Sequence, residues 1–138
     1  SRQYLIPILL SMLISTIGYF IMYGIPLSGI PEIDDISYVE ISNNRLDVQA
    51  RRFTDIEELE KAVNVTHFLS YKPGKPEIEE PIIEMIFHLK DVTSLSVSAN
   101  EKTVYKNGKA YVLKGDNGEV FIRISEGIFF FHDLHENV

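Results

Sequence analysis

The chain opens with an apolar run that shows no alternation between hydrophobic and polar positions. Residues 4–27 read YLIPILLSMLISTIGYFIMYGIPL, and the breaks in this run are small or weakly polar residues. As an α-helix, the 24 residues would span about 36 Å, enough to cross a hydrocarbon core of roughly 30 Å with some tilt. A domain of this size has too little structure to bury such a segment on all sides. The pattern therefore predicts a transmembrane helix.

The segment 1–28 is predicted to be a retained signal anchor, with cleavage as the open alternative. A signal peptide has an apolar stretch of only about 7 to 15 residues and then a small-x-small site, and neither feature is present here. Arg2 is the single charge before the run, whereas Glu32, Asp34 and Asp35 follow it. The positive-inside rule then predicts a single-pass protein of the cell membrane, with an extracytoplasmic C-terminal domain.

After the anchor, the hydrophobic pattern changes to that of a folded domain. Glycine and proline punctuate a predicted linker at 29–35, and the domain is predicted to occupy 36–138. Residues 36–41 and 46–53 are rich in strand-forming types and are separated by two asparagines, which predicts a hairpin.

An amphipathic helix is predicted over 55–68. Thr54 and Glu57 have the spacing of a capping box, in which each side chain bonds a backbone N–H at the helix start. Ile56, Leu59 and Val63 recur at intervals of three and four, as on the buried face of a helix.

Strand patterns dominate the rest of the chain. The proline-rich segment 72–81 predicts an irregular loop, and 82–89 and 94–99 alternate apolar and polar residues. Asn107-Gly108 predicts a tight hairpin turn that pairs the strands on either side. In this register Val104 lies opposite Tyr111 and Tyr105 lies opposite Ala110.

The closing segment also alternates. In 119–124, EVFIRI, every second residue is apolar, and Glu126-Gly127 predicts a turn into a last strand at 128–131. The predicted fold class is therefore α+β. An N-terminal transmembrane helix precedes an antiparallel meander sheet of about six or seven strands, packed on at least one amphipathic helix.

Charge and composition limit the function. From Glu32 onward the chain holds all 20 acidic residues and 12 of its 13 basic residues, a formal charge of −8. Such a domain is not expected to bind nucleic acid, because neutralising phosphates requires a basic surface. The absence of cysteine excludes a disulfide scaffold, a cysteine nucleophile and a thiolate metal site. Neither acidic run, at 32–35 or 77–84, has the spacing of a calcium loop.

The histidines are the weak candidates for metal or acid–base chemistry. His132 and His135 would share one face of a helical turn and could bind a metal with a neighbouring carboxylate, but on a strand they would point to opposite faces. A solvated tail is the preferred interpretation, so no metal site and no cofactor are predicted. His88 could pair with Glu84, yet no nucleophile or third group accompanies them, and no catalytic residue is assigned.

Three consecutive aromatic residues are the weak candidates for a partner-binding surface. Phe129, Phe130 and Phe131 cannot all face one side of a strand, so at least one would point away from the core unless both faces are covered. An exposed phenylalanine beside an open strand edge could dock another protein.

The order of elements resembles a known group of proteins. A membrane anchor, a strand pair, the helix FTDIEELEKAV, a proline-bearing crossing and a closing segment EGIFFF are similar to small extracytoplasmic domains of unknown function in Gram-positive bacterial exported proteins. The resemblance covers roughly 32–131. It implies an exported domain behind an N-terminal anchor, without an assigned activity or site residues.

Three functions follow from this sequence. The first is a membrane-anchored extracytoplasmic interaction or sensing module, not an enzyme, that binds a protein or cell-envelope component. The second is a small metal-dependent or hydrolytic enzyme. The third is a regulatory or immunity-like membrane subunit in which the transmembrane helix itself binds. The common motifs for phosphate, zinc, serine hydrolase and dinucleotide sites are absent from the sequence.

Overall fold

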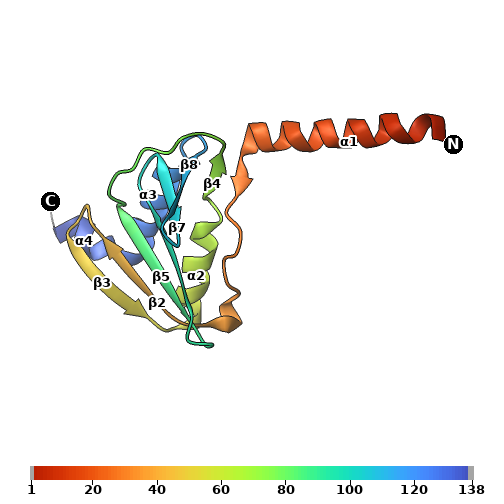
Figure 1. The fold of residues 1–138 in the computed structure, drawn as a ribbon. Coiled ribbons are helices and arrows are strands. Elements are labelled where there is room, and N and C mark those ends of the chain that lie inside the picture. Colours follow the sequence, from red (N-terminus) through yellow and green to blue (C-terminus); the bar gives the residue numbers. More distant parts are fainter. Residues whose placement is uncertain (1, 137–138) are drawn as a thin grey trace.

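The computed structural model describes residues 2–136 and shows a projecting helix joined to an α+β domain (Figure 1). Helix α1, Arg2–Tyr23, contains no buried residue and is long and apolar enough to cross a membrane. It contacts the domain near strand β4, Ser70–Lys72. The predicted anchor segment, 1–28, begins one residue before the described part of the chain. The predicted domain, 36–138, extends two residues past it, so residues 1 and 137–138 lie outside the described residues.

Helix α1 ends four residues before the apolar run does. Gly24 has a positive φ of 81° and follows the last helical residue, as is usual at a helix end. Ile25–Pro26 then forms strand β1, which pairs with β4. Leu27 is buried in the core of the domain. The run 4–27 is therefore helical only to Tyr23, and its last residues belong to the folded domain.

The remaining elements form one sheet with helices on one face. After a short 3-10 turn η1, Ile33–Asp35, the chain forms β2 (Ile36–Asn43), β3 (Val48–Phe53), α2 (Ile56–Thr66), β4, β5 (Ile83–Leu89), β6 (Ser94–Ala99), β7 (Thr103–Lys106), β8 (Lys109–Leu113), α3 (Asn117–Phe129) and α4 (Phe131–Glu136).

The sheet confirms the predicted α+β class with an antiparallel sheet. Its order is β1-β4-β8-β7-β6-β5-β2-β3, and every neighbouring pair is antiparallel. Strands β5 to β8 are a simple meander, the β2–β3 hairpin lies beside β5, and β4 and β1 extend the opposite edge. Eight strands form instead of six or seven because two very short ones, β1 and β4, join that edge.

The hairpin between β7 and β8 has the predicted register. Asn107 and Gly108 both adopt positive φ angles, 49° and 83°, which the tight turn requires and which asparagine and glycine tolerate best. The residues that face each other are Val104 with Tyr111 and Tyr105 with Ala110.

The prediction that the chain closes with two strands is wrong. Residues 119–124 lie inside α3, the Glu126-Gly127 turn is also helical, and 128–131 spans the end of α3 and the start of α4. The β-branched residues favoured a strand, but packing against the sheet overrides this weak local preference. The buried positions recur at helical spacing and are Gly118, Phe121, Ile122, Ser125, Glu126 and Phe129.

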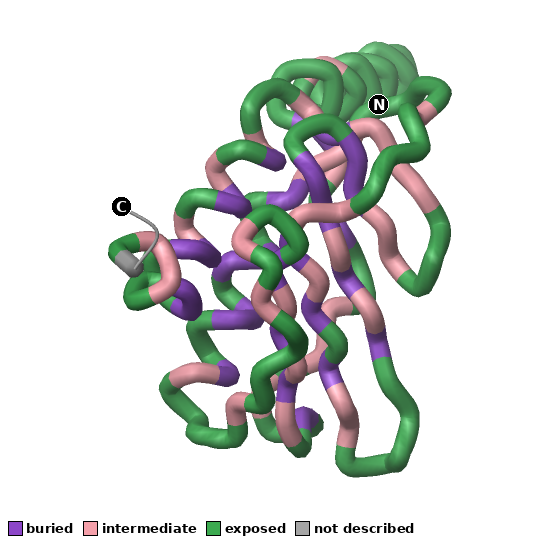
Figure 2. Tube along the Cα trace, turned by 90° about the vertical axis from the view of Figure 1, so that its left-hand side faces the viewer, coloured by how far each residue is buried: buried purple, intermediate pink, exposed green. Residues whose placement is uncertain are grey.

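Helices α2 and α3 pack on the same face of the sheet and enclose the core. In strands β2, β5 and β6, buried residues on this face alternate with more exposed ones (Figure 2). The largest fully buried side chains of the strands are Phe87, Ile41, Ile83, Met85, Val39, Val97 and Val104. The segment predicted as a linker, 29–35, also lies on the domain, since Ile30 and Ile33 pack against the core.

The capping box predicted for α2 does not form. Asp55 takes the N-cap position, one residue later than the Thr54–Glu57 pair requires, and no side-chain hydrogen bond caps the helix. The apolar stripe is also displaced, because Ile56 is 70% exposed while Leu59 and Val63 are buried. The predicted helix is confirmed, but its first turn faces solvent.

The other face of the sheet is only half covered. The proline-rich segment predicted as a loop crosses β7 and β8, where the Thr103 hydroxyl donates to the carbonyl of Glu77 at 2.7 Å. The Tyr105 hydroxyl donates to the carbonyl of Glu79 at 2.8 Å. These loop contacts lie on β7. On the same face, the side chains of β6, β5, β2 and β3 lie outside this loop, and we call this half of the face the open face.

Candidate functional site

The three consecutive phenylalanines have different environments. Phe129 and Phe130 are buried in the core, and Phe131 is 54% exposed at the start of α4. The Phe129 ring packs against Phe53 with a centroid distance of 5.1 Å, and the Arg51 guanidinium lies 5.5 Å from the Phe130 centroid. Phe131 is therefore the phenylalanine of this triplet with a largely exposed ring, while the other two anchor the end of α3.

A groove lies where the start of α2 meets the end of α3, directly beside Phe129. Its volume is about 730 Å³. We call it the α2–α3 groove. Its lining residues are Thr54, Asp55, Ile56, Glu57, Glu58, Lys61, Ile128 and Phe129.

The apolar part of the α2–α3 groove is unusually exposed. Ile56 and Ile128 expose 70% and 40% of their surface, and they come from different helices. A single exposed isoleucine needs no explanation, but here two of them line one groove together with Phe129. This is the arrangement that a protein partner can bury.

The polar part of the groove is acidic. Asp55, Glu57 and Glu58 surround the first turn of α2, where they complement the positive end of the helix dipole, and Lys61 is the one basic residue in the lining. Partial burial, with a further contribution from the charge of Asp55, raises the pKa of the Glu58 carboxyl above its ordinary value. The groove would therefore gain from an incoming positive charge.

A second polar cluster lies on the open face. His88 Nε2 is 2.6 Å from Glu40 Oε1, the imidazole stacks on the Tyr38 ring with a centroid distance of 4.3 Å, and the Arg52 guanidinium lies 4.1 Å from the same ring. The partner of His88 is thus on the neighbouring strand, whereas Glu84 accepts a hydrogen bond from Asn44. Within the described part of the chain, no serine, threonine or lysine side chain is hydrogen-bonded to His88 or Glu40. The cluster therefore lacks an activated nucleophile of these types.

His132 and His135 lie on α4, so they do share a helical turn. The ring of Phe131 packs edge-on against His135, with centroids 4.4 Å apart. Among the described side chains, no group of three or more potential ligands is arranged to hold a metal ion. The side chain of Glu136, a carboxylate next to His135, is outside the described part of the structure.

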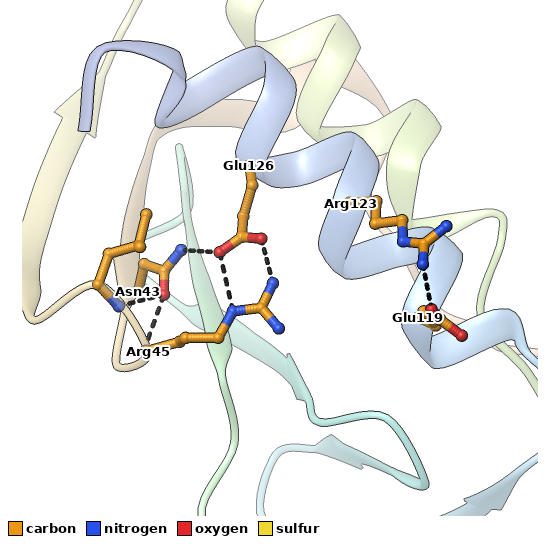
Figure 3. Close-up of polar contacts among 6 residues, drawn as sticks. Asn43, Arg45, Glu119, Arg123 and Glu126 are labelled. Carbon is orange, nitrogen blue, oxygen red and sulfur yellow. Dashed lines mark hydrogen bonds and ion pairs between the residues drawn. The ribbon is translucent and has the colours of Figure 1, made fainter. Parts of the chain in front are cut away.

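A buried carboxylate joins α3 to the β2–β3 hairpin. Glu126 is only 4% exposed and accepts hydrogen bonds from the Asn43 amide, at 2.8 Å, and from the Arg45 guanidinium through both of its oxygens (Figure 3). The Asn43 carbonyl in turn accepts the backbone N–H of Arg45 and of Leu46. These groups satisfy the buried Glu126 carboxylate from inside through Asn43 and from the surface through the partly exposed Arg45, which is the arrangement of a structural clamp. Glu119 and Arg123 form a separate, exposed ion pair on the same helix (Figure 3).

Sequence reasoning pointed to the triplet but missed the groove beside it. Ile56 fitted the buried stripe of a helix, and Ile128 fitted a strand, so nothing in the pattern placed them together. One signal for the exposure of Ile56 was available in the sequence. Asp55 is a typical residue at a helix start, and Ile56 follows it directly, so Ile56 stands on the first turn, at the end of the buried stripe.

The chain has no detectable relatives in the comparisons with known proteins: no protein-family model, no curated protein and no solved structure matches it. The resemblance to exported domains of Gram-positive bacteria therefore stays a prediction.

Proposed function

We propose that this protein is a membrane-tethered interaction module that displays its acidic domain on the extracytoplasmic side and binds a protein partner in the α2–α3 groove. Helix α1 supports the tether, because it is apolar along its length and none of its residues is buried by the domain. A helix of this composition would be strongly unfavourable in water, and a bilayer supplies the burial that the domain does not.

The observation that carries the proposal is the pairing of exposed isoleucines with an acidic rim in one groove. Apolar side chains supply affinity when they are buried, and complementary charges supply orientation and fast association. The matching partner segment carries apolar side chains next to lysine or arginine. Binding fits a surface that combines exposed apolar side chains with a charged rim.

Orientation is testable because the chain has no cysteine. Lys90 is exposed in the β5–β6 turn, far from α1, so Lys90→Cys gives a single thiol for a membrane-impermeant maleimide. We expect labelling in intact cells, since Arg2 precedes α1, no lysine or arginine follows it before Arg45, and the positive-inside rule keeps the more basic flank in the cytoplasm. Labelling only after lysis would place the domain in the cytoplasm.

Partner binding is testable by crosslinking from inside the groove. A photoreactive benzoylphenylalanine at Ile56 of the full chain, in the native membrane, should give a crosslinked product of discrete mass. The same residue at Val92, which is 98% exposed in a distant turn, should not.

A charge reversal makes the result specific. Glu57→Lys with Glu58→Lys should abolish the product, because the rim would then repel a basic segment. Glu60→Lys, on the same helix but outside the groove lining, should retain it. A product of the same mass from Val92, or one that survives the reversal, would exclude the groove as the partner site.

A further inference from the structure

A second, mainly apolar pocket lies where α1 meets the domain. Helix α1 provides one wall through Ile17, Phe20 and Ile21, and the domain provides the other through Ile25 and Pro73. The volume of this junction pocket is about 370 Å³. Its two remaining lining residues, Lys72 and Lys114, come from the edge of the sheet that carries β4 and β8.

The position of the junction pocket along α1 is that of a membrane interface. From Ile17 to the end of the helix at Tyr23 the rise is about 9 Å, so the pocket spans the last two turns. Tyr19, Phe20 and Tyr23 are exposed around these turns, as aromatic residues are where acyl chains meet headgroups. The apolar wall would then face the upper part of an acyl chain, and the lysines would lie at the level of lipid phosphates.

The lysines of the pocket are available for an anionic ligand. Among the described side chains of residues 2–135, no carboxylate lies within 4.0 Å of the ammonium group of Lys72 or Lys114, whereas the nearby Lys102 pairs with Glu77 at 3.3 Å. A lysine can extend its aliphatic stem along the apolar wall and hold its charge among phosphates. In the adjoining hollow, Lys72, Lys75 and Lys102 lie with Glu77 and Glu101, and the Lys102–Glu77 pair accounts for one charge of each sign.

The positive charges of Lys72 and Lys114 stand in an otherwise acidic domain. A formal charge of −8 from Glu32 onward would repel an anionic membrane surface, so a local group of cations at the junction selects which edge approaches the lipid. The acidic residues of the linker lie at the opposite end of the domain, near η1 (Figure 1).

We propose that the junction pocket binds an anionic phospholipid, with its acyl chain against α1 and its phosphate between Lys72 and Lys114. Such a lipid fixes how the domain stands on the membrane and leaves the α2–α3 groove accessible. This inference rests on the membrane tether in the proposed function.

The absence of tryptophan allows a direct test. Pro73→Trp in the full chain places one fluorophore at the pocket, and the chain is reconstituted in phosphatidylcholine vesicles that contain brominated phosphatidylglycerol or brominated phosphatidylcholine. Bromine quenches tryptophan only on contact. We expect quenching at a much lower mole fraction of the brominated anionic lipid, because one lysine at an anionic surface is worth roughly a fivefold preference.

Two variants separate the pocket from general attraction. Adding Lys72→Gln and Lys114→Gln should remove most of the preference, up to roughly 25-fold for two lysines, whereas Lys90→Gln in the distant turn should leave it unchanged. Equal quenching by both lipids, or a preference that survives the double change, overturns the lipid site while the tether stands.

The tether has its own readout. If neither lipid quenches and the chain does not float with the vesicles, both the lipid site and the membrane-tethered function are excluded. If circular dichroism shows that Pro73→Trp does not fold, native mass spectrometry of the unsubstituted chain in mixed micelles replaces it. Retention of phosphatidylglycerol over phosphatidylcholine then supports the site, and equal retention overturns it.

Discussion

The two faces of the sheet use the same strands for different purposes. On the covered face, Val39, Ile41 and Phe87 are completely buried under α2 and α3. On the open face, the intervening positions hold serines, acidic residues and the polar cluster around His88. An antiparallel sheet can leave one face in water, so the open face needs no partner to be stable. Burial, rather than residue type, therefore decides which side chains the fold depends on.

The largest difference between the faces should appear when an apolar side chain is removed. Phe121→Ala deletes a fully buried ring between α3 and the sheet and should lower the free energy of unfolding by about 3–5 kcal/mol. Ile86→Ala, on the open face and 37% exposed, should cost less than about 1 kcal/mol. Urea unfolding of the full chain in mild detergent, followed by near-ultraviolet circular dichroism of the tyrosines, measures both. Equal losses would contradict the assignment of the core to the helical side.

Removing a buried carboxylate should also cost more stability than removing an exposed one, although the difference should be smaller than for the apolar side chains. Glu126→Ala leaves the Asn43 amide buried without its acceptor and should cost about 2–3 kcal/mol, less than for a fully buried ion pair because Arg45 is partly exposed. Glu84→Ala removes only an exposed hydrogen bond to Asn44 and should change stability by less than about 0.5 kcal/mol. A cost below 1 kcal/mol for Glu126→Ala, in the same urea titration, would show that the clamp is dispensable.

Two glycines of α3 offer a comparison within one helix. A Cβ at Gly118 would lie 2.6 Å from the backbone carbonyl oxygens of Asn100 and Glu101, so Gly118→Ala should destabilise the fold by about 2 kcal/mol. A Cβ at Gly127 meets nothing within 4 Å, and Gly127→Ala should stabilise the helix by about 0.5–1 kcal/mol. Thermal unfolding would show shifts of opposite sign. A loss at both positions would contradict a helix through Gly127.

The faces also explain how much could be predicted from the sequence. Strands β5 and β6 were predictable because one face of each is buried and the other is not, which produces alternation with a period of two. The β7–β8 hairpin was predictable from its Asn107-Gly108 turn. The segment 119–124 alternates as well, yet the contacts that make it a helix lie in distant strands. The groove was unpredictable for the same reason, since Ile56 and Ile128 meet only once α3 is helical.

The smallest expected effect lies at the rim of the α2–α3 groove. Burial beside Asp55 raises the pKa of Glu58, so the folded protein holds a proton there more tightly than the unfolded chain does. The contribution to stability is then fully present below the ordinary carboxyl pKa and is lost as the pH rises through the raised value. Glu58→Gln removes this penalty and should raise the free energy of unfolding at neutral pH by less than about 0.5 kcal/mol.

The pH dependence distinguishes this effect from a general loss of negative charge. At about pH 3, where a carboxyl is protonated in both states, Glu58→Gln should leave stability unchanged. Glu60→Gln, on the same helix but outside the groove lining, is the matched control for the loss of one negative charge from α2. If Glu58→Gln instead destabilises the protein at neutral pH, the ionised Glu58 stabilises the fold, and the acidic rim has no unmet need for a positive charge.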